Sequence, residues 1–150
     1  MALTGLDHIN LKVRDLERSR KFYELLGFEE TGSRDRMLFF AVAGHHHHIA
    51  LLEMGEDAVD PPRHSVGGLH FAITVDEEAE IGRLYRQVTE AGYKVVRTID
   101  HFSNRSFYVK DPDGNAVEIT YDVPKAEWAH VADNPFATDL DYEIPGEESG

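Results

Sequence analysis

The chain of 150 residues contains no cysteine, so disulfide bonds, thiolate nucleophiles and zinc–thiolate sites are excluded. Basic residues are few: 15 Lys and Arg stand against 28 Asp and Glu, for a formal net charge of −13. We therefore expect no nucleic-acid partner and no membrane partner, because both require a cationic face. No apolar run approaches the length of a membrane span, and Met1–Asp15 lacks the pattern of a secretory leader. These absences predict a cytoplasmic globular protein.

What the chain does contain is an internal repeat. The segments Gly5–Val13 and Gly68–Val75 both alternate apolar and polar residues, which predicts strands, and His8 and His70 occupy equivalent positions in them. Each strand is followed by a predicted helix and then by three strand-like segments. The helices are predicted over 16–26, after the N-cap Asp15 and before Gly27, and over 77–91, after the N-cap Asp76 and before Gly92.

The repeat predicts an α+β fold built from two tandem βαβββ modules. Module 1 covers about residues 3–54, a linker with two prolines covers 55–67, and module 2 covers about 68–121, so that residues 1–121 form a single domain. Residues 122–150 are acidic and contain three prolines. We expect them to form a C-terminal tail that is partly disordered.

Two histidines at equivalent repeat positions suggest a shared metal site, and one carboxylate completes the set. Glu118 stands between Val117 and Ile119 in a strand that is predicted to be half buried. A carboxylate there has to be paired or metal-bound, because burying it alone is costly. Two imidazoles and one carboxylate form the facial ligand set that is typical of non-haem Fe(II) oxygenases. The candidate metal ligands are therefore His8, His70 and Glu118.

The chain from His101, through Phe107-Tyr108 and the turn Asp111-Pro112-Asp113-Gly114, to Glu118 resembles a family signature. The signature is that of the extradiol ring-cleavage (catechol 2,3-) dioxygenases in the vicinal oxygen chelate superfamily, which also includes glyoxalases and bleomycin-resistance proteins. The likeness covers about residues 3–128. It implies a glyoxalase-like fold, with both modules in one cup-shaped mixed-sheet barrel around a metal site.

The resemblance also implies roles for single residues. It places Fe(II) on His8, His70 and Glu118, with Mn(II), Ni(II) or Zn(II) as alternative metals. It places His101 and Tyr108 on the substrate side of the metal.

The histidine run 45–48 precedes an apolar strand and matches the family pattern His-His-x-φ-Ala-φ over residues 46–51, where φ is apolar. By resemblance, the second histidine of the pair, His47, is the catalytic acid–base residue. Strand alternation instead places His46 and His48 on the face of Ala50, so His47 requires a local bulge to reach that face. His46 is the fallback.

The implied function is an Fe(II)-dependent extradiol dioxygenase of aromatic compound catabolism, which opens a catechol-type aromatic diol with O2. Exposed sheet edges favour a homodimer. Where module 2 has Glu118, module 1 has Ala50, whereas glyoxalase-I-like members have a fourth ligand there. Ala50 thus favours an oxygenase over a glyoxalase-like isomerase or epimerase. A metal-free small-molecule binding or resistance protein is the remaining alternative.

Overall fold

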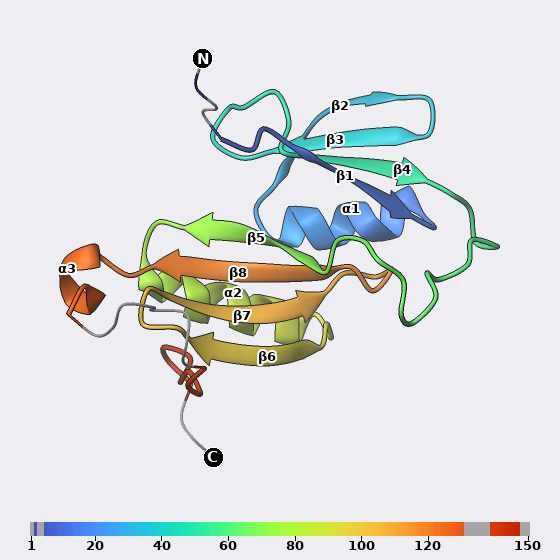
Figure 1. Ribbon diagram of the computed structural model, residues 1–150. Helices are drawn as coiled ribbons and strands as arrows, with labels where there is room; N and C mark the ends of the chain where they lie inside the picture. Colours follow the sequence, from blue (N-terminus) through green and yellow to red (C-terminus); the bar gives the residue numbers. More distant parts are fainter. Residues whose placement is uncertain (1, 3–4, 131–138, 148–150) are drawn as a thin grey trace. The chain divides into compact units, whose positions relative to one another are not determined.

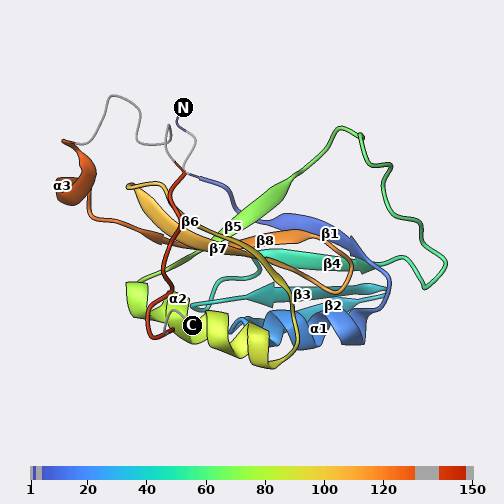
Figure 2. The same ribbon diagram turned by 90° about the horizontal axis from the view of Figure 1, so that it is seen from below.

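The computed structural model describes residues 2, 5–130 and 139–147. They belong to two compact units, Met1–Val66 (unit 1) and Gly67–Gly150 (unit 2). Each unit contains one four-stranded mixed sheet with a helix against one of its faces (Figures 1 and 2). The predicted α+β class and the βαβββ order of each module are confirmed.

The sheet of unit 1 has the order β1-β4-β3-β2, with β1 parallel to β4 and the other neighbours antiparallel. Its helix begins after Asp15 as predicted, because the Asp15 side chain accepts a hydrogen bond from the backbone N–H of Arg18 at 2.6 Å. Gly27 follows the helix with φ +93°, a conformation that favours glycine. The elements are β1 (Ile9–Val13), α1 (Leu16–Leu25), β2 (Glu29–Arg34), β3 (Met37–Ala41) and β4 (Ile49–Glu53).

The sheet of unit 2 repeats this topology in the order β5-β8-β7-β6. The predicted N-cap Asp76 is wrong: the cap is Glu77, whose extended backbone directly precedes the helix and whose side chain makes no capping hydrogen bond. The elements are β5 (His70–Val75), α2 (Glu78–Glu90), β6 (Val95–Asp100), β7 (Asn104–Lys110), β8 (Ala116–Asp122) and the short α3 (Lys125–Trp128).

Each unit has its own apolar core between helix and sheet. In unit 1, Phe22 of α1 and Phe40 of β3 are fully buried, and in unit 2 the same holds for Val88 of α2 and Phe107 of β7. Burying side chains of this size stabilises the fold by about 1.5–3 kcal/mol each. In each unit, the core therefore fixes one face of the sheet against the helix, and the helix leaves the opposite face uncovered.

The described strands form two separate sheets with no pairing from one sheet to the other, so the expected barrel is not closed. No helix in the described part of the chain is long and apolar enough to cross a membrane.

Part of the predicted C-terminal tail packs against the rest of its unit. Residues 139–147, which we call the C-terminal strap, pack against unit 2, with Tyr142 and Ile144 buried and Leu140 bridged to Asp100 of β6 (Figure 2). The expectation that the tail is partly disordered also covers residues 131–138 and 148–150, which lie outside the described residues.

Candidate functional site

One row of residues crosses the sheet of unit 2. The strand register aligns Ala72 of β5 with Glu118 of β8, Glu118 with Tyr108 of β7, and Tyr108 with Arg97 of β6. Directly paired residues point to the same face of a sheet, and so does His70, two residues before Ala72. The sheet therefore gathers an imidazole, a carboxylate, a phenol and a guanidinium on one face.

Glu118 is the buried acid of this row, with a side chain that is 8% exposed. Its Oε2 lies 3.1 Å from Nε2 of His70. Among the described residues, no lysine or arginine forms an ion pair with it. The 3.1 Å separation is close to the roughly 3.0 Å expected between neighbouring ligands of an octahedral ion with bonds of about 2.1 Å. These two side chains thus form a donor pair that suits a divalent cation.

Tyr108 lies beside this pair, on the neighbouring strand β7. Its ring meets the His70 ring edge-on, with centroids 5.3 Å apart and an interplanar angle of 87°. Burial, followed by the charge of Glu118 and a hydrogen bond to it, raises the pKa of Tyr108 to about 12. The phenol therefore stays protonated at neutral pH and serves as a hydrogen-bond donor.

A cavity of about 340 Å³ opens on the same face. Its lining includes His70 and Tyr108 together with two cations, Arg97 and Lys110. Arg97 is not identifiable from the sequence, because a register shift between Val95 and Arg97 in β6 decides which residue lies opposite Tyr108.

His101 follows β6 at a tight connection in which Phe102 has φ +63°. Its Nδ1 lies 3.2 Å from Oδ1 of Asp139 in the strap, and the other oxygen of Asp139 accepts a hydrogen bond from Nη2 of Arg97. One strap carboxylate thus holds both His101 and the cavity residue Arg97. The sequence contained no signal for this contact, because Asp139 lies in the acidic tail, outside both predicted modules.

In unit 1, His8 directly precedes β1, and its Nδ1 lies 2.6 Å from Oδ2 of Asp7. The ring of His47 lies 4.4 Å from that of His8 and 5.2 Å from that of Phe39, measured between centroids. Phe39 pairs with Ala50, so His47 lies beside residues on the face of Ala50.

His47 lies in the connection before β4, outside the regular strand, so strand alternation does not fix its direction. Strand β4 begins only at Ile49, and the preceding connection contains positive φ angles at Ala43 and Gly44. Desolvation, followed by the charges of His8 and His46, lowers the pKa of His47. The imidazole is therefore held in its neutral form, which can accept a proton.

The two units carry different chemistry on equivalent backbone. The row of unit 1 that matches Ala72, Glu118, Tyr108 and Arg97 consists of Asn10, Ala50, Phe39 and Gly32, and a register shift recurs between Glu30 and Gly32. Ala50 therefore occupies the strand position of Glu118, as the repeat predicts. A carboxylate is present at this position in unit 2 and absent in unit 1.

The candidate residues are distributed over both units. His8 and His47 lie in unit 1, while His70, His101, Tyr108 and Glu118 lie in unit 2. The structure brings His8 and His47 together, and separately His70, Tyr108 and Glu118.

Comparisons with known proteins show what the chain is similar to. The chain is 32% identical over 152 residues to catechol-2,3-dioxygenase of Bacillus subtilis (strain 168), which covers 98% of the chain and 53% of that protein. The chain thus spans about half the length of this relative.

Two solved structures have the same fold. An integron cassette protein from the mobile metagenome of the Halifax Harbour sewage outfall is 31% identical, with a TM-score of 0.62 over 79% of this chain and 99% of that one. The fosfomycin resistance protein FosX of Listeria monocytogenes is 22% identical, with a TM-score of 0.63 over 84% and 99%. At that identity, the likeness to FosX concerns the fold alone.

A protein-family model matches residues 5–119, which include all the candidate residues named above apart from those of the strap. The match extends over well more than half of the chain and over both sheets. The chain belongs to the Glyoxalase/Bleomycin resistance protein/Dioxygenase superfamily.

Proposed function

We propose that the chain is an Fe(II)-dependent extradiol dioxygenase that opens a catechol-type aromatic diol with O2. The observation that carries this proposal is the buried carboxylate of Glu118, which has an imidazole 3.1 Å away and a protonated phenol beside it. The likeness to a catechol-2,3-dioxygenase over nearly the whole chain supports it.

The donor set fits a divalent metal. Glu118 is buried and forms an ion pair with the imidazole of His70, so a cation would compensate its charge. We propose that His8 is the third ligand, because it occupies the repeat position equivalent to His70. Bound there, Fe(II) would acidify the diol and make O2 reactive toward it. Mn(II), Ni(II) and Zn(II) are the alternative occupants.

The other candidate residues would transfer a proton or stabilise the negative charge of the bound diol. His47 would take a hydroxyl proton at Nε2, because its Nδ1 lies 2.8 Å from Nδ1 of His46 and is engaged there. Tyr108 would donate a hydrogen bond to the bound diolate from its O–H group. His101, held by Asp139, would supply a further hydrogen bond on the substrate side.

The reaction breaks the ring carbon–carbon bond beside the two hydroxyl-bearing carbons. O2 is the oxidant, and both of its atoms enter the product, a yellow muconic semialdehyde-type acid. The alternative, a glyoxalase-like isomerase or epimerase, would use a carboxylate ligand from unit 1. Ala50 occupies that position and is fully buried, so the strand offers no such ligand there.

The test is anaerobic loading of the metal-free chain with Fe(II), followed by addition of catechols and O2. We expect equimolar O2 consumption and a yellow ring-opened product. Glu118→Gln should reduce turnover at least about 100-fold, whereas Glu56→Gln, a change at an exposed carboxylate, should not affect it. Isomerisation of a thiohemiacetal by the nickel-loaded chain, without ring opening by the iron-loaded chain, would support the alternative instead.

The role of His47 has its own comparison. His47→Ala should retain bound iron and lose turnover, while His64→Ala in the exposed linker should retain both. Full activity of the His47 variant would refute its assignment as the base. We also propose that the active form is a homodimer, which sedimentation velocity would measure.

A further inference from the structure

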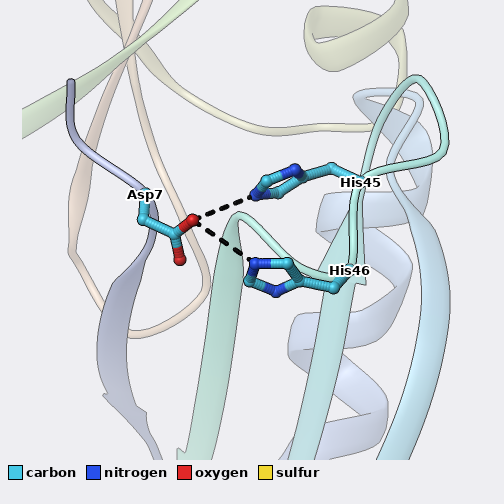
Figure 3. A group of neighbouring side chains, drawn as sticks. All are labelled: Asp7, His45 and His46. Carbon is cyan, nitrogen blue, oxygen red and sulfur yellow. Dashed lines mark ion pairs between the residues drawn. The ribbon is translucent and has the colours of Figure 1, made fainter. Parts of the chain in front are cut away.

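A second cluster of potential metal ligands lies in unit 1, outside the row described above. Asp7 stands before β1, and His45 and His46 stand in the connection between β3 and β4 (Figure 3). One ligand atom from each of the three side chains lies within 4.8 Å of the other two. Both imidazoles point toward the Asp7 carboxylate from the same side.

The distances within the cluster suit a tetrahedral ion. Oδ1 of Asp7 lies 3.4 Å from Nε2 of His45 and 3.3 Å from Nε2 of His46. Two ligands of a tetrahedral zinc ion with bonds of about 2.0–2.1 Å lie about 3.3 Å apart. Both distances from the carboxylate oxygen to an imidazole nitrogen therefore match those between two ligands of one ion.

The hydrogen bonding around the cluster selects these three side chains. Oδ2 of Asp7 lies 2.6 Å from Nδ1 of His8, which leaves Oδ1 to face the two imidazoles. His47 contacts Nδ1 of His46, and Nδ1 of His48 accepts a hydrogen bond from the backbone N–H of Val42 at 3.3 Å. The Nε2 atoms of His45 and His46 are the ring nitrogens directed at Asp7.

One of these nitrogens makes no hydrogen bond within the described part of the chain. Nε2 of His45 is shielded from solvent and has no hydrogen-bond partner among the described residues, since the Asp7 oxygen at 3.4 Å makes no hydrogen bond with it. Buried polar atoms normally have a partner, and an unsatisfied one calls for an explanation such as a bound ion. A cation between Asp7 and the two imidazoles would satisfy it.

We propose that Asp7, His45 and His46 bind a divalent transition-metal ion of the zinc class. Imidazole and carboxylate ligands in a tetrahedral arrangement are typical of zinc. The site is separate from the proposed Fe(II) centre, because it shares no ligand with His8, His70 and Glu118. The ion would fasten the segment before β1 to the connection between β3 and β4, and would hold the carboxylate that contacts His8.

The experiment measures metal binding without any activity assay. The chain with His70→Ala and Glu118→Gln loses two ligands of the proposed Fe(II) centre and serves as the background. After treatment with a chelator, it is titrated with Co(II) and then with Zn(II), while the visible absorption of tetrahedral Co(II) and the bound metal per chain are measured. We expect one ion per background chain, with a tetrahedral Co(II) spectrum.

Variants at the cluster and away from it give the decisive comparison. In the background chain, His45→Ala with His46→Ala should weaken binding at least about 100-fold, and Asp7→Asn at least about 10-fold. His64→Ala, which removes a histidine from the exposed linker, should leave binding unchanged. The side chains of Asp7, His45 and His46 are all at least partly exposed. Circular dichroism would show whether each variant retains the fold. His46→Gln provides a milder second variant.

Two results would overturn the proposal. One is a background chain that binds no stoichiometric ion. The other is a variant with Asp7→Asn that binds as tightly as the background, because the ion would then be held by the histidine run alone. Neither result bears on ring cleavage, which is tested by the iron-loaded wild-type chain.

Discussion

A Cβ atom on Gly82 of α2 would lie 2.1 Å from the carbonyl oxygen of Pro145, far inside van der Waals contact. The same carbonyl accepts a hydrogen bond from Nη1 of Arg86 at 3.2 Å. The backbone of the strap is thus in direct contact with the helix, and glycine at position 82 makes this approach feasible.

Gly82→Ala tests this contact. Alanine would favour the helix by about 0.5–1 kcal/mol, but the collision with Pro145 should cost about 1–3 kcal/mol or displace the strap. We expect a lower free energy of unfolding in urea and faster proteolysis of residues 139–147. Gly68→Ala is the control, since its Cβ would meet nothing within 4 Å. A Gly82 variant that is more stable, with an equally protected strap, would contradict the contact.

Tyr142 in the strap gives a pH-dependent prediction. Its hydroxyl donates a hydrogen bond to Oε1 of Glu78 at 2.9 Å, and burial, followed by that hydrogen bond and the charge of Glu78, raises its pKa. A raised pKa in the folded state stabilises the fold fully below the ordinary tyrosine pKa of about 10, and this stabilisation is lost as the pH rises above 10.

Tyr142→Phe should therefore lower the free energy of unfolding by about 1 kcal/mol at pH 7. The variant should also lose less stability than the wild type between pH 9 and pH 11. Denaturant unfolding across this pH range measures both effects, with Tyr121→Phe as the comparison. Equal alkaline loss in wild type and Tyr142→Phe would show that Tyr142 does not produce the decline.

Asp139→Asn tests the contact between the strap and His101. Loss of the negative charge should weaken the hold on His101 and Arg97, and should lower kcat/KM for ring cleavage about 10-fold to 100-fold. A changed tautomer of His101 in imidazole nitrogen NMR spectra would separate positioning from a loss of fold. Asp141→Asn, at an exposed strap residue, is the matched control. Unchanged His101 signals together with full activity would argue against the role.

Arg97 and Lys110 predict a preference among substrates. Two cations in a cavity beside His70 and Tyr108 should favour aromatic diols that carry an anionic substituent, such as a carboxylate. Lys110→Met should raise KM for a carboxylated catechol about 10-fold, which corresponds to about 1.4 kcal/mol, and should leave KM for catechol unchanged. Lys94→Met, at an exposed lysine outside the cavity, should change neither. A similar rise for both substrates would refute an electrostatic preference.

Local patterns predicted the elements well, and long-range contacts escaped them. The repeat, the cap Asp15 and the terminating Gly27 depend on neighbouring residues, so the sequence shows them directly. Arg97 lies in the row because of a register shift in β6, and no local sequence pattern predicts this shift. Asp139 contacts His101 although the two residues lie far apart in the sequence, and the composition of the tail gives no sign of this contact.

The matching rows of the two sheets suggest a use in protein design. Gly32, Phe39 and Ala50 form a bare copy of the backbone frame on which unit 2 carries Arg97, Tyr108 and Glu118. The side chains of the unit 2 row could therefore be introduced at the matching positions of unit 1 to design a second site. Because the same frame carries different side chains in the two units, the fold separates the geometry of the row from its chemistry.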